Sequence, residues 1–333
     1  MRVLFCLLGF LLFGGCCSLP DDSAWQRFEY VDPEMGVDFH LKFYAKDRPT
    51  AERIARQTYA RVEALNAIFS DYDPTSELNR LCQKPHGQPI KVSRELFDIL
   101  QRAQILARET DGAFDITAGP MIRLWRIARK QQKLPTPEAL AAVKPRVGFG
   151  KIKLNGRNRT VTLRAPQMQL DLGGIAKGYA VDEAMEILKA NCIHRAFVAA
   201  SGDLLTSSPP LSDPEGWRVL IRNVDQFGNL YPRTVHLKHQ ALSTSGDTEQ
   251  FVEINGRRYS HIVDPRTGYG LTHRMQVTVI SEASTQSDSH ATAISVVGIK
   301  HGLKFAKQKK LQAIILDLKT KKPRITESEW WKW

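Results

Sequence analysis

A hairpin signal within residues 246–270 constrains the fold of this chain more than any other stretch. Polar and apolar residues alternate over positions 251–254, and the dipeptide Asn255-Gly256 follows them directly. This dipeptide favours a type I′ turn, because both central residues of that turn need a positive φ. Residues 258–263 are then expected to return as a second strand, which ends where Pro265 interrupts the hydrogen-bond ladder.

Polar side chains gather at the end of the expected second strand. Tyr259, Ser260, His261 and Asp264 stand beside a glycine-rich loop. Polar groups in such places are candidates for chemistry, since catalytic residues are often carried on loops at the ends of rigid elements. The alternative interpretation is a plain surface hairpin with no chemical role.

A second informative stretch, residues 171–182, combines a strand end, two glycines and a helix. Met168 and Leu170 are expected to point inward from a strand that runs into Gly173-Gly174. Glycine lets the backbone approach an anion closely, and the N-terminus of the following helix is positive. The pattern therefore favours an anion site, although two glycines also precede helices that bind no anion.

A third stretch, residues 287–293, carries a pair of oxygen ligands. Asp288 and Thr292 are four positions apart and hence share one face of a helix. A carboxylate with a hydroxyl suits a hard cation such as Mg²⁺. The alternative is an aspartate that caps the helix and a threonine unrelated to it.

Taken together, these stretches resemble the ApbE family, the FAD:protein FMN transferases. The resemblance covers about residues 28–318 and rests on seven motifs in the same order. They are Met35-Gly36, residues 69–72 with 75–78, residues 110–117, 171–182, 243–247, 259–268 and 288–292. Two small departures occur: Ser201 stands where the family usually has glycine, and Ser287 where it usually has alanine.

The resemblance implies a Mg²⁺-dependent reaction with FAD as substrate. The pyrophosphate of FAD is split, FMN is transferred to a Thr or Ser hydroxyl of an acceptor protein, and AMP leaves. The implied acceptor is a flavoprotein subunit of a membrane redox complex. Two other functions remain open: a FAD pyrophosphatase, in which water replaces the acceptor hydroxyl, and a flavin-binding lipoprotein without turnover. Mere binding needs neither the Asp288–Thr292 pair nor His261, which argues against the last.

The resemblance also implies roles for particular residues. Asp288, Thr292 and the carbonyl of Gly174 are the expected Mg²⁺ ligands, so Asp288 counts as catalytic. His261 is the expected general base, because an unperturbed imidazole titrates near pH ~6.5. Asp247 either orients His261 or binds ribose. The expected FAD-binding residues are Met35, Tyr72, Ala113, Phe114, Asp115, Asp171, Lys177 and Ile262.

The N-terminus indicates export. One arginine precedes an apolar run of about a dozen residues, which is typical of a signal peptide and too short to span a membrane. Gly14-Gly15-Cys16 resembles a lipobox with Cys16 as the lipidated residue, and an ordinary cleaved signal peptide is the alternative. We expect a signal peptide over 1–16, a tether over 17–34, an ApbE-like domain over 35–325 and a Trp-rich tail over 326–333. The expected location is the bacterial cell envelope, lipid-anchored and facing the periplasm.

The pattern of elements predicts an α+β fold. Strands and helices are mixed without a regular βαβ alternation, and the motifs scatter from residue 35 to 292, so the active site is expected between two intertwined lobes. Residues 123–157 are basic, polar and proline-rich, with only a short helix expected at 137–143 before the next strands. The tail either touches a membrane surface or packs back on the core.

Charge and cysteine usage add less. The formal net charge of +12 favours anionic ligands and lipid headgroups in general, but no nucleic-acid motif is found. Cys82 and Cys192 are the only cysteines outside residues 1–17. They leave room for one disulfide and lack the spacing of a zinc site.

Overall fold

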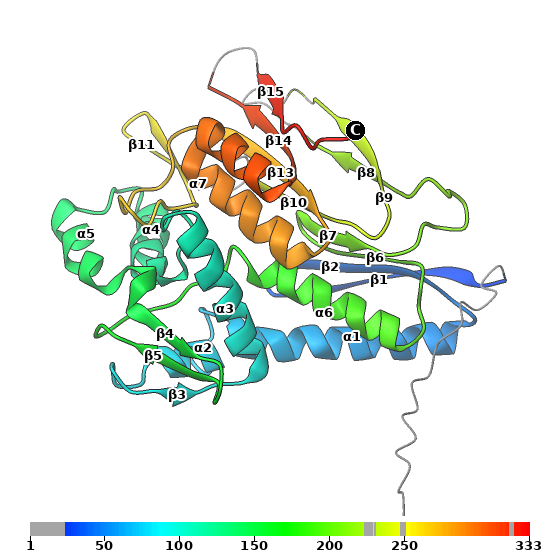
Figure 1. The fold of residues 1–333 in the computed structure, drawn as a ribbon, viewed down its shortest axis with the longest axis horizontal. Coiled ribbons are helices and arrows are strands. Elements are labelled where there is room, and N and C mark those ends of the chain that lie inside the picture. Colours follow the sequence, from blue (N-terminus) through cyan, green and yellow to red (C-terminus); the bar gives the residue numbers. More distant parts are fainter. Residues whose placement is uncertain (1–23, 223–228, 230, 247–250, 320–322) are drawn as a thin grey trace, which may run out of the picture.

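The computed structural model of the protein describes residues 24–222, 229, 231–246, 251–319 and 323–333. The predicted signal peptide, the lipidation site Cys16 and Asp247 lie outside these residues. Within the described part of the chain, the main element is an eight-stranded antiparallel sheet (Figure 1). Its strands, in spatial order, are β1 (Gln26–Glu34), β2 (Val37–Ala45), β6 (Ala196–Ala200), β7 (Asp203–Thr206), β10 (Ala241–Gly246), β13 (Met275–Ser281), β14 (Gln312–Asp317) and β15 (Arg324–Glu327).

Both faces of this sheet are covered, because successive side chains of a strand point to opposite faces. Val198 of β6 and Leu205 of β7 face the main core, whereas their neighbours Ala199 and Leu204 face a smaller apolar cluster. Three long helices pack on the main-core side in the order α1 (Arg48–Phe69), α6 (Ala176–Ala190) and α7 (Ser284–Lys309). The other side carries a two-stranded ribbon of β8 (Trp217–Ile221) and β9 (Arg233–Leu237).

The contact between α6 and α7 is unusually close, and this fixes where the functional residues lie. A Cβ atom on Gly178 would clash with the carbonyl oxygen of Ser284, so only glycine allows the approach. One turn further along α6, Asp182 accepts hydrogen bonds from the backbone N–H groups of Ser284 (2.6 Å) and Thr285 (2.9 Å). A carboxylate at this place satisfies the free N–H groups at the start of α7. Asp182 thus fixes the start of α7 against α6.

A second lobe lies beside the sheet and is built from two separate parts of the chain (Figure 1). The hairpin of β11 and β12 packs on α4 through Val252, Tyr259 and Trp125, so the lobes are intertwined as predicted. The first of these two parts also contains three short 3₁₀ turns, at residues 116–118, 144–146 and 149–151. The elements of this lobe are α2 (Glu77–Cys82), β3 (Ile90–Lys91), α3 (Arg94–Glu109), α4 (Gly119–Gln131), α5 (Pro137–Val143), β4 (Ile152–Asn155), β5 (Thr160–Leu163), β11 (Phe251–Ile254) and β12 (Arg257–Ser260).

Several sequence predictions are confirmed by this fold. The chain is α+β, and the helix expected over residues 137–143 is α5. Asn255 and Gly256 have φ values of 54° and 69°, both positive as a type I′ turn requires. The second strand of the hairpin is shorter than expected, because β12 ends at Ser260 and His261 already lies beyond it.

Two expectations were wrong, and one pairing that the sequence left possible does not form. Residues 26–34 are not part of a tether but form β1, which pairs along its whole length with β2. Residues 123–131 were expected to lack structure, yet they belong to α4, where Met121, Trp125 and Ala128 recur on one buried face. Cys82 is a free thiol, so no disulfide joins it to Cys192.

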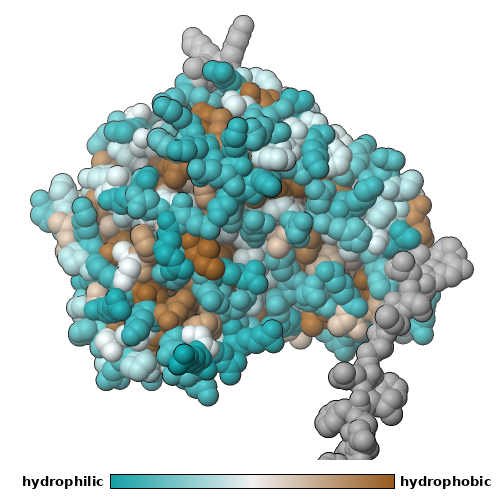
Figure 2. Space-filling model, viewed as in Figure 1, coloured by the Kyte–Doolittle hydropathy of each residue, from teal (hydrophilic) through white to brown (hydrophobic). Residues whose placement is uncertain are grey.

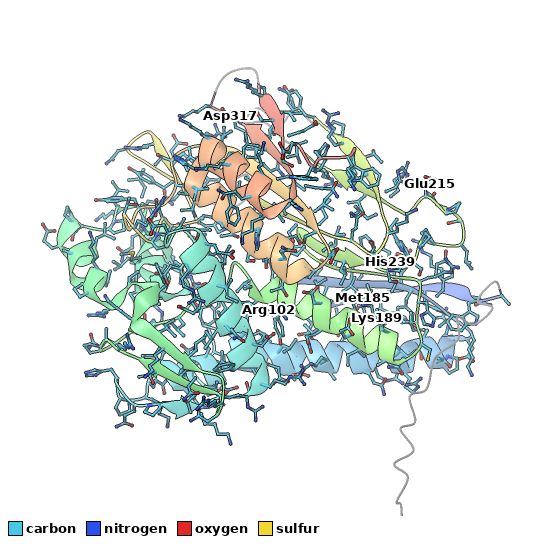
Figure 3. The ribbon with its side chains drawn as sticks, in the orientation of Figure 1. Arg102, Met185, Lys189, Glu215, His239 and Asp317 are labelled. Atoms are coloured by element: carbon cyan, nitrogen blue, oxygen red, sulfur yellow. The ribbon has the colours of Figure 1, made fainter. Side chains whose placement is uncertain are left out.

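The surface is mixed in character. On the face drawn in Figure 2, hydrophilic residues predominate and hydrophobic ones form small scattered patches. Helix α6 shows the same contrast between core and solvent, since Met185 is fully buried while Lys189 reaches the surface (Figure 3). Of the tail, Trp331 packs on the smaller apolar cluster, whereas Trp330 and Trp333 stay exposed. Within the described residues, no helix is both long and apolar enough to cross a membrane.

Candidate active site

The first group of predicted site residues surrounds the ammonium group of Lys177, the second residue of α6. Its Nζ lies 3.0 Å from Oδ2 of Asp203, at the start of β7, and 3.9 Å from Oδ2 of Asp288 on α7. The same Asp288 oxygen accepts a 3.0 Å hydrogen bond from the backbone N–H of Gly178. We call Lys177, Asp203 and Asp288 the Lys177 cluster. It places one cation between two buried carboxylates.

The Lys177 cluster contains two acidic groups and one basic group. Burial raises the pKa of Asp288 to about 7, and the Asp203 carboxylate acts in the same direction against the opposing effect of Lys177. Burial alone would lower the pKa of Lys177, but Asp203 and Asp288 outweigh it and leave that pKa raised. When all three groups are ionised, the cluster carries one excess negative charge. A bound cation would offset that charge.

Gly174 and Thr292, the other two predicted metal ligands, lie against each other. A Cβ atom on Gly174 would stand 3.2 Å from Oγ1 of Thr292 and 3.3 Å from Cε2 of Phe114. Thr292 follows Asp288 by one helical turn on α7. The structure therefore brings the predicted ligand residues onto two adjoining segments, with the predicted FAD-binding Phe114 beside them.

The second group surrounds the guanidinium of Arg126, a residue of α4. Nη1 of Arg126 binds Asp71 and Nη2 binds Oδ2 of Asp171 at 2.8 Å. Its Cζ also lies 4.2 Å from the centroid of the Tyr72 ring. We call Asp71, Tyr72, Arg126 and Asp171 the Arg126 cluster. Two residues predicted to bind FAD, Tyr72 and Asp171, thus meet through an arginine.

Burial and the neighbouring Asp71 raise the pKa of Asp171, while Arg126 and the backbone N–H of Gly173 oppose them. That N–H donates a 2.8 Å hydrogen bond to Oδ1 of Asp171. For Arg126, burial acts to lower the pKa, and its hydrogen bond to Asp71 leads the effects that leave it raised. The loop before α6 is therefore tied to α4, and Gly173 connects the Arg126 cluster to Gly174.

Ala113 and Ile262, also predicted to bind FAD, come together from distant parts of the chain. They form a small apolar cluster with Leu271 and Val296. Val296 follows Thr292 by one turn on α7. His261 is half-buried and directly precedes Ile262, so the predicted base stands beside this cluster.

The remaining two residues predicted to bind FAD are Asp115 and Met35. Oδ1 of Asp115 accepts hydrogen bonds from the N–H and the hydroxyl of Thr117, at 2.8 and 2.7 Å, and so caps the following 3₁₀ turn. Burial raises the pKa of Asp115. Met35 adopts a positive φ of 51° between β1 and β2 and packs at the edge of the main core.

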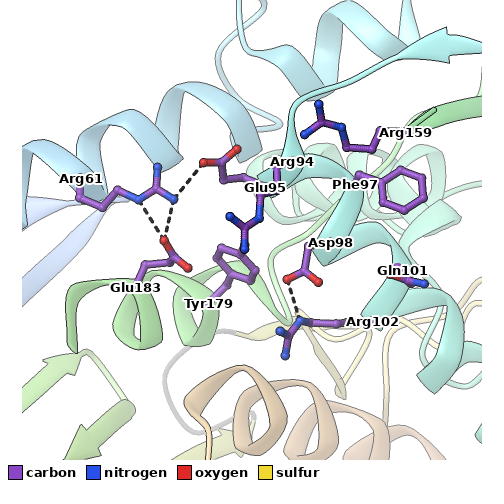
Figure 4. Close-up of a pocket in the computed structure, with 10 residues that line it drawn as sticks. All are labelled: Arg61, Arg94, Glu95, Phe97, Asp98, Gln101, Arg102, Arg159, Tyr179 and Glu183. Carbon is purple, nitrogen blue, oxygen red and sulfur yellow. Dashed lines mark hydrogen bonds and ion pairs between the residues drawn. The ribbon is translucent and has the colours of Figure 1, made fainter. Parts of the chain in front are cut away.

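Two cavities differ in their relation to these groups. One of 380 Å³ lies between α1, α3 and α6, where Arg61 binds both Glu95 and Glu183 (Figure 4). None of the predicted site residues lines it. The other, of 690 Å³, is lined by Tyr259 and Asp264 on either side of His261, and by Leu271 and Val296 of the apolar cluster. Of these two cavities, the larger adjoins the predicted site residues.

Comparison with known proteins shows the family of the chain. The family model described as "ApbE family" matches residues 35–315. The chain belongs to the ApbE family. It is 31% identical over 305 residues to a protein of Haemophilus influenzae named FAD:protein FMN transferase, covering 88% of this chain and 87% of that one.

Solved ApbE structures share the fold as well as the sequence. The flavin transferase ApbE from Vibrio cholerae superposes with a TM-score of 0.84 at 26% identity, covering 92% of this chain and 98% of that one. The apo form of the flavinyl transferase ApbE from Pseudomonas stutzeri gives a TM-score of 0.82 at 26% identity, covering 92% and 95%. The ApbE fold thus extends over nearly the whole described chain.

Reasoning from sequence missed three residues of this ApbE site. Asp182 stood in a motif that supports the resemblance and Asp203 stood beside the departure at Ser201, but neither received a role. Arg126 lay in a segment expected to lack structure. The signal for α4 was present, since Pro120 at its first turn and the spacing of Met121, Trp125 and Ala128 are typical of an amphipathic helix.

Proposed function

We propose that this protein is a FAD:protein FMN transferase that uses Mg²⁺ to transfer FMN from FAD to a Thr or Ser hydroxyl of an acceptor protein, with release of AMP. The observation that carries the proposal is that Thr292, one turn after Asp288 on α7, lies against Gly174, which also adjoins Phe114. The names of the relatives support the flavin chemistry.

The residues present fit a hard cation. Asp288 is a buried carboxylate in a cluster with excess negative charge, and Thr292 adds a hydroxyl on the same helical face. Among the described residues, no three His, Cys, Asp or Glu side chains form a ligand group. We propose that Gly174, Asp288 and Thr292 would hold the ion together with oxygens from substrate and water. When bound, Mg²⁺ would neutralise charge that develops on the pyrophosphate.

Binding of FAD divides between the two sides of the site. Ala113, Phe114 and Ile262 offer apolar surface, and Tyr72 offers a ring on which a planar group stacks. Lys177 and the backbone before α6 place positive charge toward the phosphates. Asp203 holds Lys177 at 3.0 Å and so fixes where that charge lies.

His261 acts on the acceptor hydroxyl. Its imidazole accepts the proton as the hydroxyl oxygen forms a bond to the phosphorus of the FMN half. The bond from that phosphorus to the bridging oxygen breaks, and AMP leaves with the electron pair. The proton thus ends on His261, the FMN phosphoryl group on the acceptor oxygen, and the bridging oxygen on AMP.

Substitution of His261 tests this role. His261→Ala should leave FAD affinity nearly unchanged, while transfer falls by roughly 10²–10⁴-fold because the base is lost. FAD affinity is measured by flavin fluorescence and chemistry by single-turnover AMP release. His86→Ala, an exposed histidine between α2 and β3, is the control. Weakened FAD binding with unchanged chemistry would exclude His261 as the base.

The identity of the products separates the proposal from its alternatives. The protein is incubated with FAD, Mg²⁺ and a candidate acceptor peptide, and the mixture is analysed by mass spectrometry. A flavinylated peptide supports transfer. Free FMN with unmodified peptide indicates a pyrophosphatase, and unchanged FAD indicates a protein that only binds flavin.

We further propose that the mature protein is anchored by lipid at Cys16, faces the periplasm and modifies a subunit of a membrane redox complex. The support is the apolar run followed by Gly14-Gly15-Cys16. Wild-type protein should partition into the detergent phase, whereas Cys16→Ser should be soluble or unprocessed. Wild-type protein recovered wholly in the aqueous phase and cleaved beyond Cys17 would contradict the anchor.

A further inference from the structure

We propose that Arg126 is a positioning residue for the flavin: its guanidinium holds the inner face of the Tyr72 ring, and the outer face receives the isoalloxazine ring. This inference rests on the proposed function, since it takes FAD as the ligand. It adds a residue that neither the motifs nor the family resemblance had pointed to.

The geometry of the ring contact is the first support. Cζ of Arg126 lies 4.2 Å from the centroid of the Tyr72 ring, which is the distance of a guanidinium in contact with an aromatic ring. Tyr72 is nevertheless 75% exposed. One face of the ring is therefore occupied by Arg126, while the opposite face is open for a planar ligand.

The second support is that Arg126 is held firmly. Its planar fork reaches Asp71 with one nitrogen and Asp171 with another, and the side chains of these aspartates are only 11% and 7% exposed. Asp171 is itself fixed by the N–H of Gly173. Moving the guanidinium away would leave two largely buried carboxylates close together without a cation, which is costly. A ligand therefore meets less resistance at the outer face of Tyr72 than at the inner one.

Tyr72 needs such support because of where it lies. It follows α1 in an exposed turn, and a ring that rotates freely loses conformational entropy when a ligand stacks on it. Arg126 orders the ring before FAD arrives. Lysine would not replace it, since a point charge lacks the planar fork that reaches both carboxylates and the ring at once.

A competing model predicts effects of opposite sign. If the guanidinium instead filled the place of the isoalloxazine ring, FAD would have to displace it. Removal of Arg126 would then strengthen FAD binding, whereas loss of a positioning residue weakens it.

The test compares Arg126→Gln, Arg126→Lys, Tyr72→Leu and the double variant Arg126→Gln/Tyr72→Leu in the full chain. The affinity for FAD is measured by flavin fluorescence without acceptor, and single-turnover AMP release is measured at saturating FAD. Lys130→Gln, on the exposed side of the same helix, is the control. Thermal melting checks folding, and Arg126→Gln/Asp71→Asn, which also removes one carboxylate, replaces Arg126→Gln if that variant is unstable.

We expect both Arg126 variants to raise the Kd for FAD about tenfold, which corresponds to ~1.4 kcal/mol, with the rate at saturating FAD little changed. Because Arg126 acts through Tyr72, the double variant should bind about as weakly as Tyr72→Leu alone. Additive losses, or an unchanged or lowered Kd, would overturn the inference. If wild-type protein itself fails to bind FAD, the proposed function fails, and that result is distinct from the others.

Discussion

In both clusters of the site one cation lies between two aspartates, but the cation is a lysine in one and an arginine in the other. Lys177 touches Asp203 and Asp288 with a single ammonium group. Arg126 spans Asp71 and Asp171 with two separate nitrogens and lies against the ring of Tyr72 as well. A compact ammonium group concentrates its charge at one point, whereas a guanidinium fixes several groups in a plane.

The two clusters also differ in what lies beside their charged groups, which are similarly buried in both. Asp203 and Asp288 project from a strand and a long helix into the junction of α6 and α7, where burial raises the pKa of Asp288 to about 7. The Arg126 cluster reaches the surface through Tyr72. Under the proposed function, the Lys177 cluster would supply charge near the reacting pyrophosphate, whereas the Arg126 cluster would hold the ring of Tyr72 for the flavin.

The largest expected effect belongs to Asp288, if the Lys177 cluster indeed serves a cation. Asp288→Ala should reduce Mg²⁺-dependent AMP release by at least roughly 10³-fold, because a metal supplies several kcal/mol of charge stabilisation. FAD binding measured by fluorescence should change much less, since the ring contacts lie elsewhere. EDTA should abolish the wild-type activity in the same assay. Near-normal turnover of Asp288→Ala in low millimolar Mg²⁺ would show that Asp288 does not serve the metal ion.

Stability should respond differently to the cation and to one of the carboxylates of the Lys177 cluster. Lys177→Met leaves two buried carboxylates without a cation and should cost about 3–5 kcal/mol. Asp203→Asn leaves one lysine with one aspartate and should cost below about 1.5 kcal/mol. Urea denaturation in EDTA measures both, with Lys189→Met on the exposed face of α6 as control. If Lys177→Met and Asp203→Asn lowered the free energy of unfolding equally, the lysine would not stabilise the protein by offsetting excess negative charge.

The contrast between the clusters also explains what sequence could and could not predict. Asp288 and Thr292 were recognisable because helical spacing puts positions i and i+4 on one face. Gly174 was assigned through the family resemblance, because a glycine pair also precedes helices that bind no anion. The shared face of Asp288 and Thr292 is a local relation, and the periodicity of a single helix suffices to infer it.

Asp203 and Arg126 acquire their roles only through contacts between distant segments. Asp203 meets Lys177 because β7 and α6 pack together, and nothing in their sequence separation indicates this. Arg126 was harder still to predict, because the basic residues around it obscured the apolar face of α4 in the sequence. Even the strand β1 was missed, since its residues are mostly exposed at the sheet edge and lack a clear alternating pattern.

A smaller effect is expected from the titration of Asp288, which should make the free energy of unfolding depend on pH. The usual pKa of aspartic acid is 3.8, and that of Asp288 is about 7 in the folded protein. Between these values the folded state holds a proton that the unfolded chain has released, so the free energy of unfolding falls as pH rises. Urea midpoints in EDTA should therefore be lower at pH 8 than at pH 5. Asp288→Asn should flatten this trend, and identical trends in both proteins would contradict the raised pKa.

The smallest effect is expected at Asp71, the carboxylate of the Arg126 cluster that lies nearest to solvent. Asp71→Asn keeps a side-chain oxygen that accepts a hydrogen bond from Arg126, and Asp171 still binds the second nitrogen at 2.8 Å. Although the side chain of Asp71 is only 11% exposed, the loss should thus be limited to part of one ion pair, about 1 kcal/mol or less. Because the guanidinium stays over the ring of Tyr72, the Kd for FAD should rise no more than roughly threefold, in contrast to Arg126→Gln. Urea denaturation and fluorescence titration of the same variant measure the two quantities. A stability loss above about 3 kcal/mol would exceed the loss expected for Asp203→Asn, and the view that Arg126 and Asp171 keep the ring of Tyr72 in place without the charge of Asp71 would fail.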